Sequence, residues 1–198
     1  MKAAQQLSQM PKGRYLIKWS PDAVGTLIPH AQEAGELSLL LRLQALRQVQ
    51  DGDIDGAIRT RRAILNIGRS FGDEPVAVSQ LIRLRCRVGC VRGVERVLAQ
   101  GQASEATLES LQRLLEDEAE QSLFLLFARA DRAAIHQFLE VAEKSKIDRA
   151  NYGMRSRTGS STIDNLLDRG KARGCHAAYL RFLNECVEIA KLPPEEQV

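Results

Sequence analysis

The chain has 198 residues, a formal net charge of +3, 44% hydrophobic residues and 27% charged residues. That length supports one domain of ordinary size with its own core, and the composition excludes a disordered chain. Aromatic residues make up 5%, and good helix formers such as Ala, Leu, Arg, Gln and Glu dominate. The composition therefore favours an all-α fold over a β-sandwich or a β-barrel.

Apolar residues that recur every three or four positions predict a series of helices after a loose N-terminal segment at residues 1–19. No segment alternates apolar and polar residues for long enough to predict a sheet strand. The predicted helices lie at residues 20–34, 37–50, 54–71, 76–100, 105–115, 117–144, 162–169 and 175–191.

Local signals set the first boundaries. Ser20 and Pro21 are a typical N-cap and first helical residue, and Pro29 is expected to kink or split the helix that they begin. Gly35 is expected to end this helix. The packed face of the next helix, 37–50, is predicted from its recurring apolar residues, which are Leu39, Leu40, Leu43, Leu46 and Val49.

The segment 76–100 contains two glycines, Gly89 and Gly93, one helical turn apart. A glycine inside a helix costs up to about 1 kcal/mol relative to alanine. Two interpretations are open: a single helix whose glycine face is covered closely by a neighbouring helix, or a turn near Gly89 that separates two helices. We predict the single helix.

The composition changes after residue 144. Residues 145–161 combine glycines, serines, threonines and arginines, which predicts a long, irregular, basic loop. The expected organisation is therefore an array of helical hairpins over residues 20–144, this loop, and C-terminal helices within 162–198 that pack on the same domain.

The stretch Gln50-Asp51-Gly52-Asp53-Ile54-Asp55-Gly56-Ala57-Ile58 resembles the turn and second-helix start of a tetratricopeptide repeat (TPR). The resemblance implies that Ala57 lies where two helices touch, with Ala45 at the small position of the first helix and Leu41 at its large position. Arg61 departs from the family, as does Gln44, because the family usually has apolar or aromatic residues there. The resemblance implies stacked antiparallel hairpins, a short α-solenoid.

A second, poorer match to the repeat begins at Gly89, 37 residues further on. Segments such as Phe71-Gly72-Asp73-Glu74-Pro75 also resemble uncharacterised bacterial helical-repeat proteins, which are often anchored by a transmembrane segment outside the matched region. That resemblance implies that the chain is a piece of a longer protein.

The charge is unevenly distributed along the chain. Residues 41–101 contain eleven arginines and six acidic residues, a net charge of +5, whereas residues 102–143 contain three arginines and nine acidic residues, a net charge of −6. The basic segment is either a face that attracts neighbouring acidic helices or a surface for an anionic partner. The candidate binding residues on it are Arg59, Arg62, Arg85, Arg92 and Arg96. In the basic loop, Arg155 and Arg157 precede a predicted helix start and could hold an anion.

The cysteines and histidines show no spacing typical of a zinc site, so we expect no metal and no cofactor. The acidic run at residues 116–120 sends its carboxylates to different faces of a helix, which predicts a solvated helix start.

Cys175 follows Arg173 at a predicted helix N-terminus, a position that favours a reactive thiolate. It is the candidate reactive thiol, and no catalytic residue is predicted.

These observations leave three functions open. The first, which we predict, is a non-enzymatic protein-interaction or scaffold module whose groove between hairpins receives a protein or peptide. The second is an enzyme of unknown class with a site near residues 155–176. The third is an anion or nucleic-acid binder that uses the arginines of residues 59–96, although the scarcity of aromatic residues there argues against base stacking.

The sequence also bears on location. No window approaches 18 apolar residues, so we expect no transmembrane helix in this chain. Residues 1–7 lack the apolar run of a signal peptide, and the four cysteines are expected to be free thiols. The expected location is the cytoplasm, with the soluble part of a membrane-anchored protein as the alternative.

Overall fold

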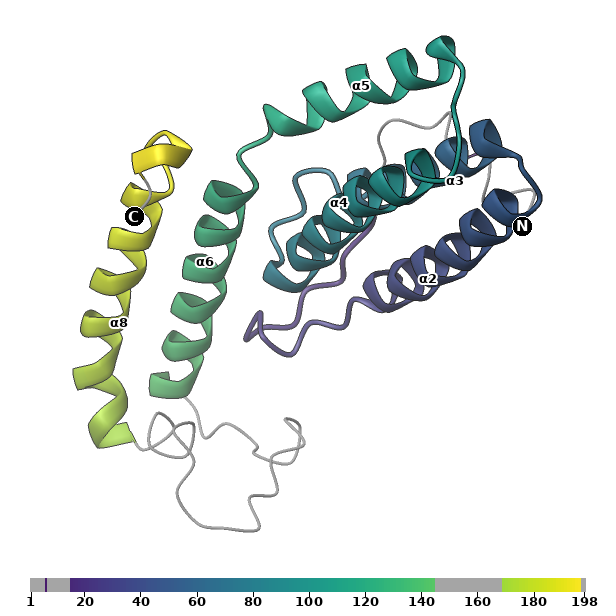
Figure 1. Ribbon diagram of the computed structural model, residues 1–198. Coiled ribbons are helices and arrows are strands. Elements are labelled where there is room, and N and C mark those ends of the chain that lie inside the picture. Colours follow the sequence, from purple (N-terminus) through teal and green to yellow (C-terminus); the bar gives the residue numbers. More distant parts are fainter. Residues whose placement is uncertain (1–5, 7–14, 145–168, 197–198) are drawn as a thin grey trace, which may run out of the picture. The chain divides into compact units, whose positions relative to one another are not determined.

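The computed structural model describes residues 6, 15–144 and 169–196 (Figure 1). This part of the chain consists of helices and connecting segments without a strand, which confirms the predicted all-α class. The helices are α2 (Pro29–Gln50), α3 (Ile54–Arg69), α4 (Ala77–Leu98), α5 (Glu105–Ala119), α6 (Leu123–Lys144), α8 (Arg169–Ile189) and the short 3-10 helix η3 (Pro194–Glu196). Helices α2 to α5 belong to one compact unit, and α6 and α8 belong to a second.

Helix α2 begins at Pro29, so the predicted helix at residues 20–34 is wrong. A proline disfavours the helical conformation of the residue before it, and Ile28 has φ −126° and ψ 65°, outside the helical region. Pro29 itself fits the first turn of a helix, where its missing N–H has no partner to lose. Gly35 lies inside α2 rather than ending it, because packing of the long helix outweighs the low helix propensity of one glycine.

The predicted packed face of α2 is also wrong. Leu39, Leu40 and Leu43 are 51%, 53% and 57% exposed, respectively. The buried face of α2 consists instead of mostly small residues, which are Ala31, Ala34, Ser38, Leu41 and Ala45. Small side chains allow α3 to pack closely against this face, so the larger leucines are left on the outside.

The turn between α2 and α3 follows its prediction. Gly52 has φ +78°, a left-handed conformation that glycine adopts without strain. Asp53 is the N-cap of α3, and its Oδ1 accepts a hydrogen bond of 2.8 Å from the backbone N–H of Gly56. The two helices therefore reverse direction within three residues and lie side by side (Figure 1).

Helix α3 is the central helix of the first unit. One cluster of buried side chains joins it to α2 and α4 and includes Leu41, Ile64 and Cys86. Another joins α3 to α4 and α5 and includes Cys90 and Leu111. Because three helices cover α3, several of its polar and charged residues are buried as well, among them Arg61 and Arg69.

A buried ion cluster ties α3, α4 and α5 together. Glu118 of α5 is 1% exposed and accepts two hydrogen bonds of 2.9 Å, from Nε and Nη2 of Arg83 in α4. Nε of Arg69 in α3 lies 4.0 Å from Glu118 Oε2, and Asp117 lies 3.8 Å from the same arginine. The expected solvated helix start at residues 116–120 is therefore wrong. These residues lie at the end of α5, and the carboxylate of Glu118 points inward to pair with Arg83 and, at longer range, with Arg69.

A second polar cluster joins the start of α2 to the segment between α3 and α4. His30 Nε2 lies 3.1 Å and 3.0 Å from the two carboxylate oxygens of Glu74, and the ring of Tyr15 stacks on His30 with centroids 4.3 Å apart. Ser79 Oγ donates a hydrogen bond to the same carboxylate, and Tyr15 Oη is 3.1 Å from Ser70 Oγ. These contacts join Tyr15 and the first turn of α2 to the segment between α3 and α4 within the first unit.

Helix α4 runs unbroken through Gly89 and Gly93, which confirms the single-helix prediction. The predicted helices at 105–115 and 117–144 differ from the structure, because α5 continues to Ala119 and the chain turns before Leu123. The predicted break at Gly170 and Gly174 is wrong, since α8 includes both. The predicted basic loop and most of the short helix at 162–169 lie outside the described residues.

The second unit has a small core of its own. Ala128 of α6 packs with Val187 and with Ala190, which follows the last residue of α8. Along the same pair of helices, His136 Nδ1 and His176 Nε2 lie 3.0 Å apart.

Candidate functional site

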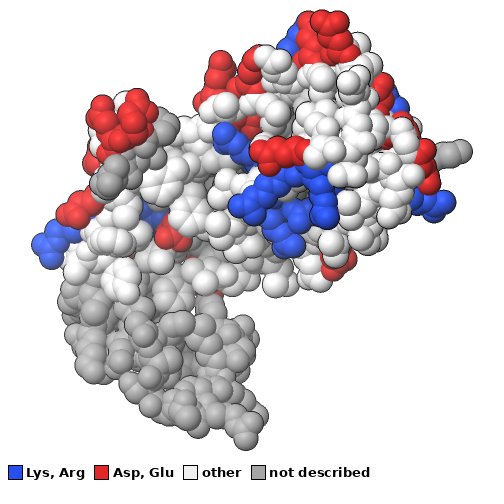
Figure 2. Space-filling view, in the orientation of Figure 1, with Lys and Arg blue, Asp and Glu red and all other residues white. Residues whose placement is uncertain are grey.

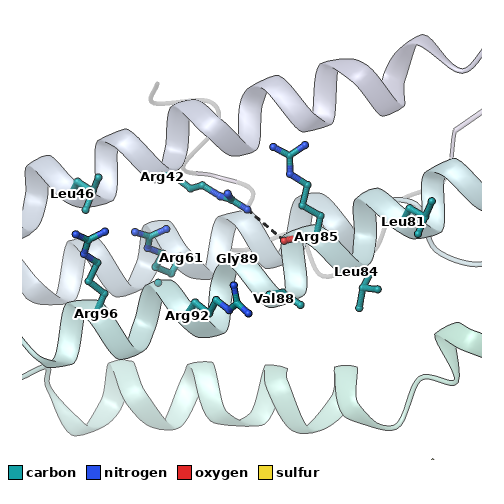
Figure 3. A pocket seen from close by; sticks show the side chains of 11 residues that line it. Arg42, Leu46, Arg61, Leu81, Leu84, Arg85, Val88, Gly89, Arg92 and Arg96 are labelled. Atoms are coloured by element: carbon teal, nitrogen blue, oxygen red, sulfur yellow. Dashed lines mark hydrogen bonds between the residues drawn. The ribbon is translucent and has the colours of Figure 1, made fainter. Parts of the chain in front are cut away.

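Five arginines line a groove in the first unit. Its walls come from α2 and α4, α3 contributes Arg61, and its volume is about 560 Å³. The cationic lining residues are Arg42, Arg61, Arg85, Arg92 and Arg96, and no acidic residue is among the lining (Figure 3). A compact group of basic side chains is visible on one face of this unit in Figure 2. The groove therefore concentrates positive charge in a concave surface.

Arg61 is the most unusual of the five, since it is 4% exposed. Its Nε is fully buried without a hydrogen-bond acceptor, and no ion pair to Arg61 is found in the described part of the chain. Burial lowers the pKa of the Arg61 guanidinium, and the neighbouring charges of Arg42 and Arg96 lower the pKa further. The arginine is too basic to lose its proton, so the protein carries an uncompensated cation at this point.

Arg42 reaches the same groove from the opposite wall. Its Nη2 donates a long hydrogen bond of 3.4 Å to the backbone carbonyl oxygen of Arg85, and its Nε is buried without an acceptor. The carbonyl group bears only a partial charge, so this contact does not neutralise the guanidinium. Figure 3 shows the nitrogen atoms of Arg42, Arg61 and Arg96 in the space between the two walls.

The two glycines of α4 make room for these side chains. A methyl group added at Gly93 would lie 2.6 Å from Arg61 Nη1, and one added at Gly89 would lie 2.9 Å from Arg42 Cζ. Any larger residue would displace the guanidinium groups from the surface of α4. Gly89 and Gly93 lower the helix propensity of α4, but they allow the side chains of Arg42 and Arg61 to lie against its surface. The expected cover was instead a closely packed neighbouring helix.

The structure separates the sequence-predicted arginines into three groups. Arg85, Arg92 and Arg96 come together in the groove. Arg59 forms an exposed ion pair of 3.9 Å with Asp53, and Arg62 donates a hydrogen bond to Ser110 of α5, so neither lines the groove. Arg155 and Arg157 lie outside the described residues.

Sequence reasoning missed Arg42 and Arg61 as groove residues. A usable signal was present for Arg61, because it occupies a position where the TPR resemblance implies an apolar or aromatic residue. The paired glycines of α4 were the other signal, since they mark close approach by something from outside the helix. Arg42 carries no comparable signal.

Three cysteines are free thiols in the structure: Cys86, Cys90 and Cys186. Burial raises the pKa of Cys86 to about 11 and that of Cys90 to about 12. Because the thiolate is the nucleophile, neither residue can support cysteine chemistry near neutral pH. Cys175 belongs to α8, but its side chain lies outside the described part, as does most of the proposed enzyme site at residues 155–176.

We expect Cys86 and Cys90 to stay unmodified when the folded protein is treated with iodoacetamide at about pH 8, near the pKa of a free thiol. Cys186, which is partly exposed, serves as the internal reference and should be alkylated. Peptide mass spectrometry with and without denaturant measures the difference. Rapid alkylation of Cys90 in the folded protein would contradict its burial. The same mass spectra measure how readily Cys175, the candidate reactive thiol, is alkylated.

Comparisons of the chain with protein-family models, with curated proteins and with solved structures gave no match. Among the described residues, no helix is both long and apolar enough to cross a membrane. The same residues contain no group of three or more His, Cys, Asp or Glu side chains placed to hold a metal ion.

Proposed function

We propose that the chain is a non-enzymatic protein-interaction module whose groove binds an anionic segment of a partner protein. The observation that carries this proposal is Arg61, a buried arginine to which no described residue supplies a counter-ion, in a groove that four more arginines line. Holding such a group out of water is unfavourable unless a negative charge compensates it. A carboxylate or phosphate of a partner would supply that charge in an electrostatically favourable geometry.

The hairpin architecture belongs to the same proposal. Leu41, Ala45 and Ala57 are all fully buried, as expected of the positions that the TPR resemblance assigns to them. This supports an arrangement of α2 with α3 and α4 with α5 as two stacked hairpins. In that arrangement α2 and α4 are equivalent first helices, and the groove between them is the place where a partner segment would lie.

The test is isothermal titration calorimetry, in which polyglutamate is titrated into the full chain. The salt concentration is about 0.1 M, at which surface charges are only partly screened. Arg92→Ala should weaken binding by about tenfold, because it removes one guanidinium from the groove. Arg87→Ala is the matched control: it removes the same charge from the same helix at a residue that does not line the groove. Undetectable binding, or equal losses for the two variants, would overturn the proposal.

A further inference from the structure

The groove is lined by apolar side chains as well as by arginines. Leu46 of α2 and Leu81, Leu84 and Val88 of α4 line it, with exposed fractions between 36% and 53%. Side chains of this size are partly exposed at a concave surface that no described part of the first unit covers. Binding pockets are often lined by apolar side chains together with a few polar or charged groups, as this groove is.

The apolar and cationic residues follow helical spacing on both walls. On α4, Leu81, Arg85, Val88 and Arg92 recur at steps of four, three and four residues, so they share one face. On α2, the lining residues Arg42 and Leu46 are four residues apart, so they also share a face. Each wall therefore presents a strip in which leucines or valines alternate with guanidinium groups.

We infer that the occupant of this groove is an amphipathic, acidic α-helix, an inference that rests on the proposed function. Such a helix presents an apolar stripe at least 100° wide, which can contact Leu46 on one wall and Leu84 on the other at once. The carboxylates that flank the stripe then lie near the groove arginines. Arg61, which has no ion pair to any residue that the structure describes, gains a negative charge. An extended peptide presents alternate side chains to opposite faces and matches the three- and four-residue spacing poorly.

Other anionic ligands fit fewer of these observations. A free phosphate would contact guanidinium groups and leave the leucines in water. A nucleic acid would provide charge, but no aromatic side chain lines the groove to stack on its bases. The acidic helix accounts for both kinds of lining residue.

The test uses two fluorescein-labelled peptides of about 20 residues, a length that allows helix formation. Both contain the same glutamates and leucines. In one, the leucines follow the three- and four-residue spacing of a single stripe, and in the other they are scattered around the helix. Fluorescence anisotropy with the full chain should give a dissociation constant about tenfold lower for the patterned peptide.

Variants of exposed leucines locate the contact. Leu84→Gln should weaken binding of the patterned peptide by about tenfold while the circular dichroism spectrum is unchanged. Leu40→Gln is the control, because Leu40 on α2 is 53% exposed, similar to the 46% of Leu84, but does not line the groove. Equal affinity for the two peptides, or no effect of Leu84→Gln, overturns the inference. If polyglutamate still binds in that case, the proposed function stands.

Two further outcomes separate the inference from the proposal on which it rests. If neither peptide nor polyglutamate binds, both fail. If single-stranded DNA or RNA of matched length binds more tightly than the patterned peptide at the same salt concentration, an acidic helix is not the ligand of the groove.

Discussion

Glu118→Gln should lower the free energy of unfolding by about 3 kcal/mol, because it leaves Arg83 and Arg69 buried without their shared carboxylate. The substitution keeps the shape of the side chain, so the loss reports the charge rather than a cavity. Urea unfolding followed by circular dichroism measures it. The ion cluster connects three helices, so the whole of the first unit should lose stability together.

An exposed ion pair on the same helix provides the control for Glu118. Glu109 pairs with Arg113 at the surface of α5, one helical turn apart. Glu109→Gln should cost no more than about 0.5 kcal/mol, since exposed helical pairs contribute little. Losses of similar size in the two variants would mean that Glu118 does not act as a buried counter-ion.

Arg61→Met should have the opposite sign and raise the free energy of unfolding by about 1–3 kcal/mol. Methionine retains much of the aliphatic packing of the arginine and removes a buried charge for which the described part of the chain supplies no ion pair. The same variant should lose affinity for polyglutamate, and polyglutamate should no longer raise its melting temperature. A gain in stability together with a loss of binding is the result expected if Arg61 serves ligand binding and lowers the stability of the free protein.

The control for Arg61 is the same substitution at another buried arginine of the first unit. Arg83→Met should be destabilising, because it leaves Glu118 without its partner at 2.9 Å. Urea midpoints of the two variants, measured side by side, should therefore move in opposite directions. If Arg61→Met destabilises as much as Arg83→Met, the guanidinium of Arg61 has a structural role and not the one assigned here.

The all-α class and several helix boundaries could be predicted because they depend on local chemistry. Asp53 caps its helix and Gly52 turns the chain through interactions with near neighbours in sequence. The start of α2 was missed although its signal is equally local, since the residue before Pro29 resists the helical conformation. The exposed leucines of α2 show a different limit: a periodic pattern identifies the faces of a helix but not which face the rest of the fold covers.

The candidate site was predictable in the part that one helix provides. Arg85, Arg92 and Arg96 share α4, so their spacing alone brings them near one another. Arg42 and Arg61 come from other helices and enter the groove through tertiary packing, which no spacing within one helix reveals. Glu118 was taken for a solvated residue for the same reason, because its partners lie on α3 and α4.

The arginines beside the leucines of the groove also bear on contact between two copies of the chain. Exposed leucines on α2 and α4 would make two molecules adhere face to face if they were the only feature of that surface. Bringing two such faces together would also bring two sets of guanidinium groups into contact, and their repulsion falls off only over the Debye length of about 10 Å at 0.1 M salt. Charge repulsion therefore disfavours contact between two such grooves, whereas an oppositely charged partner meets no such repulsion.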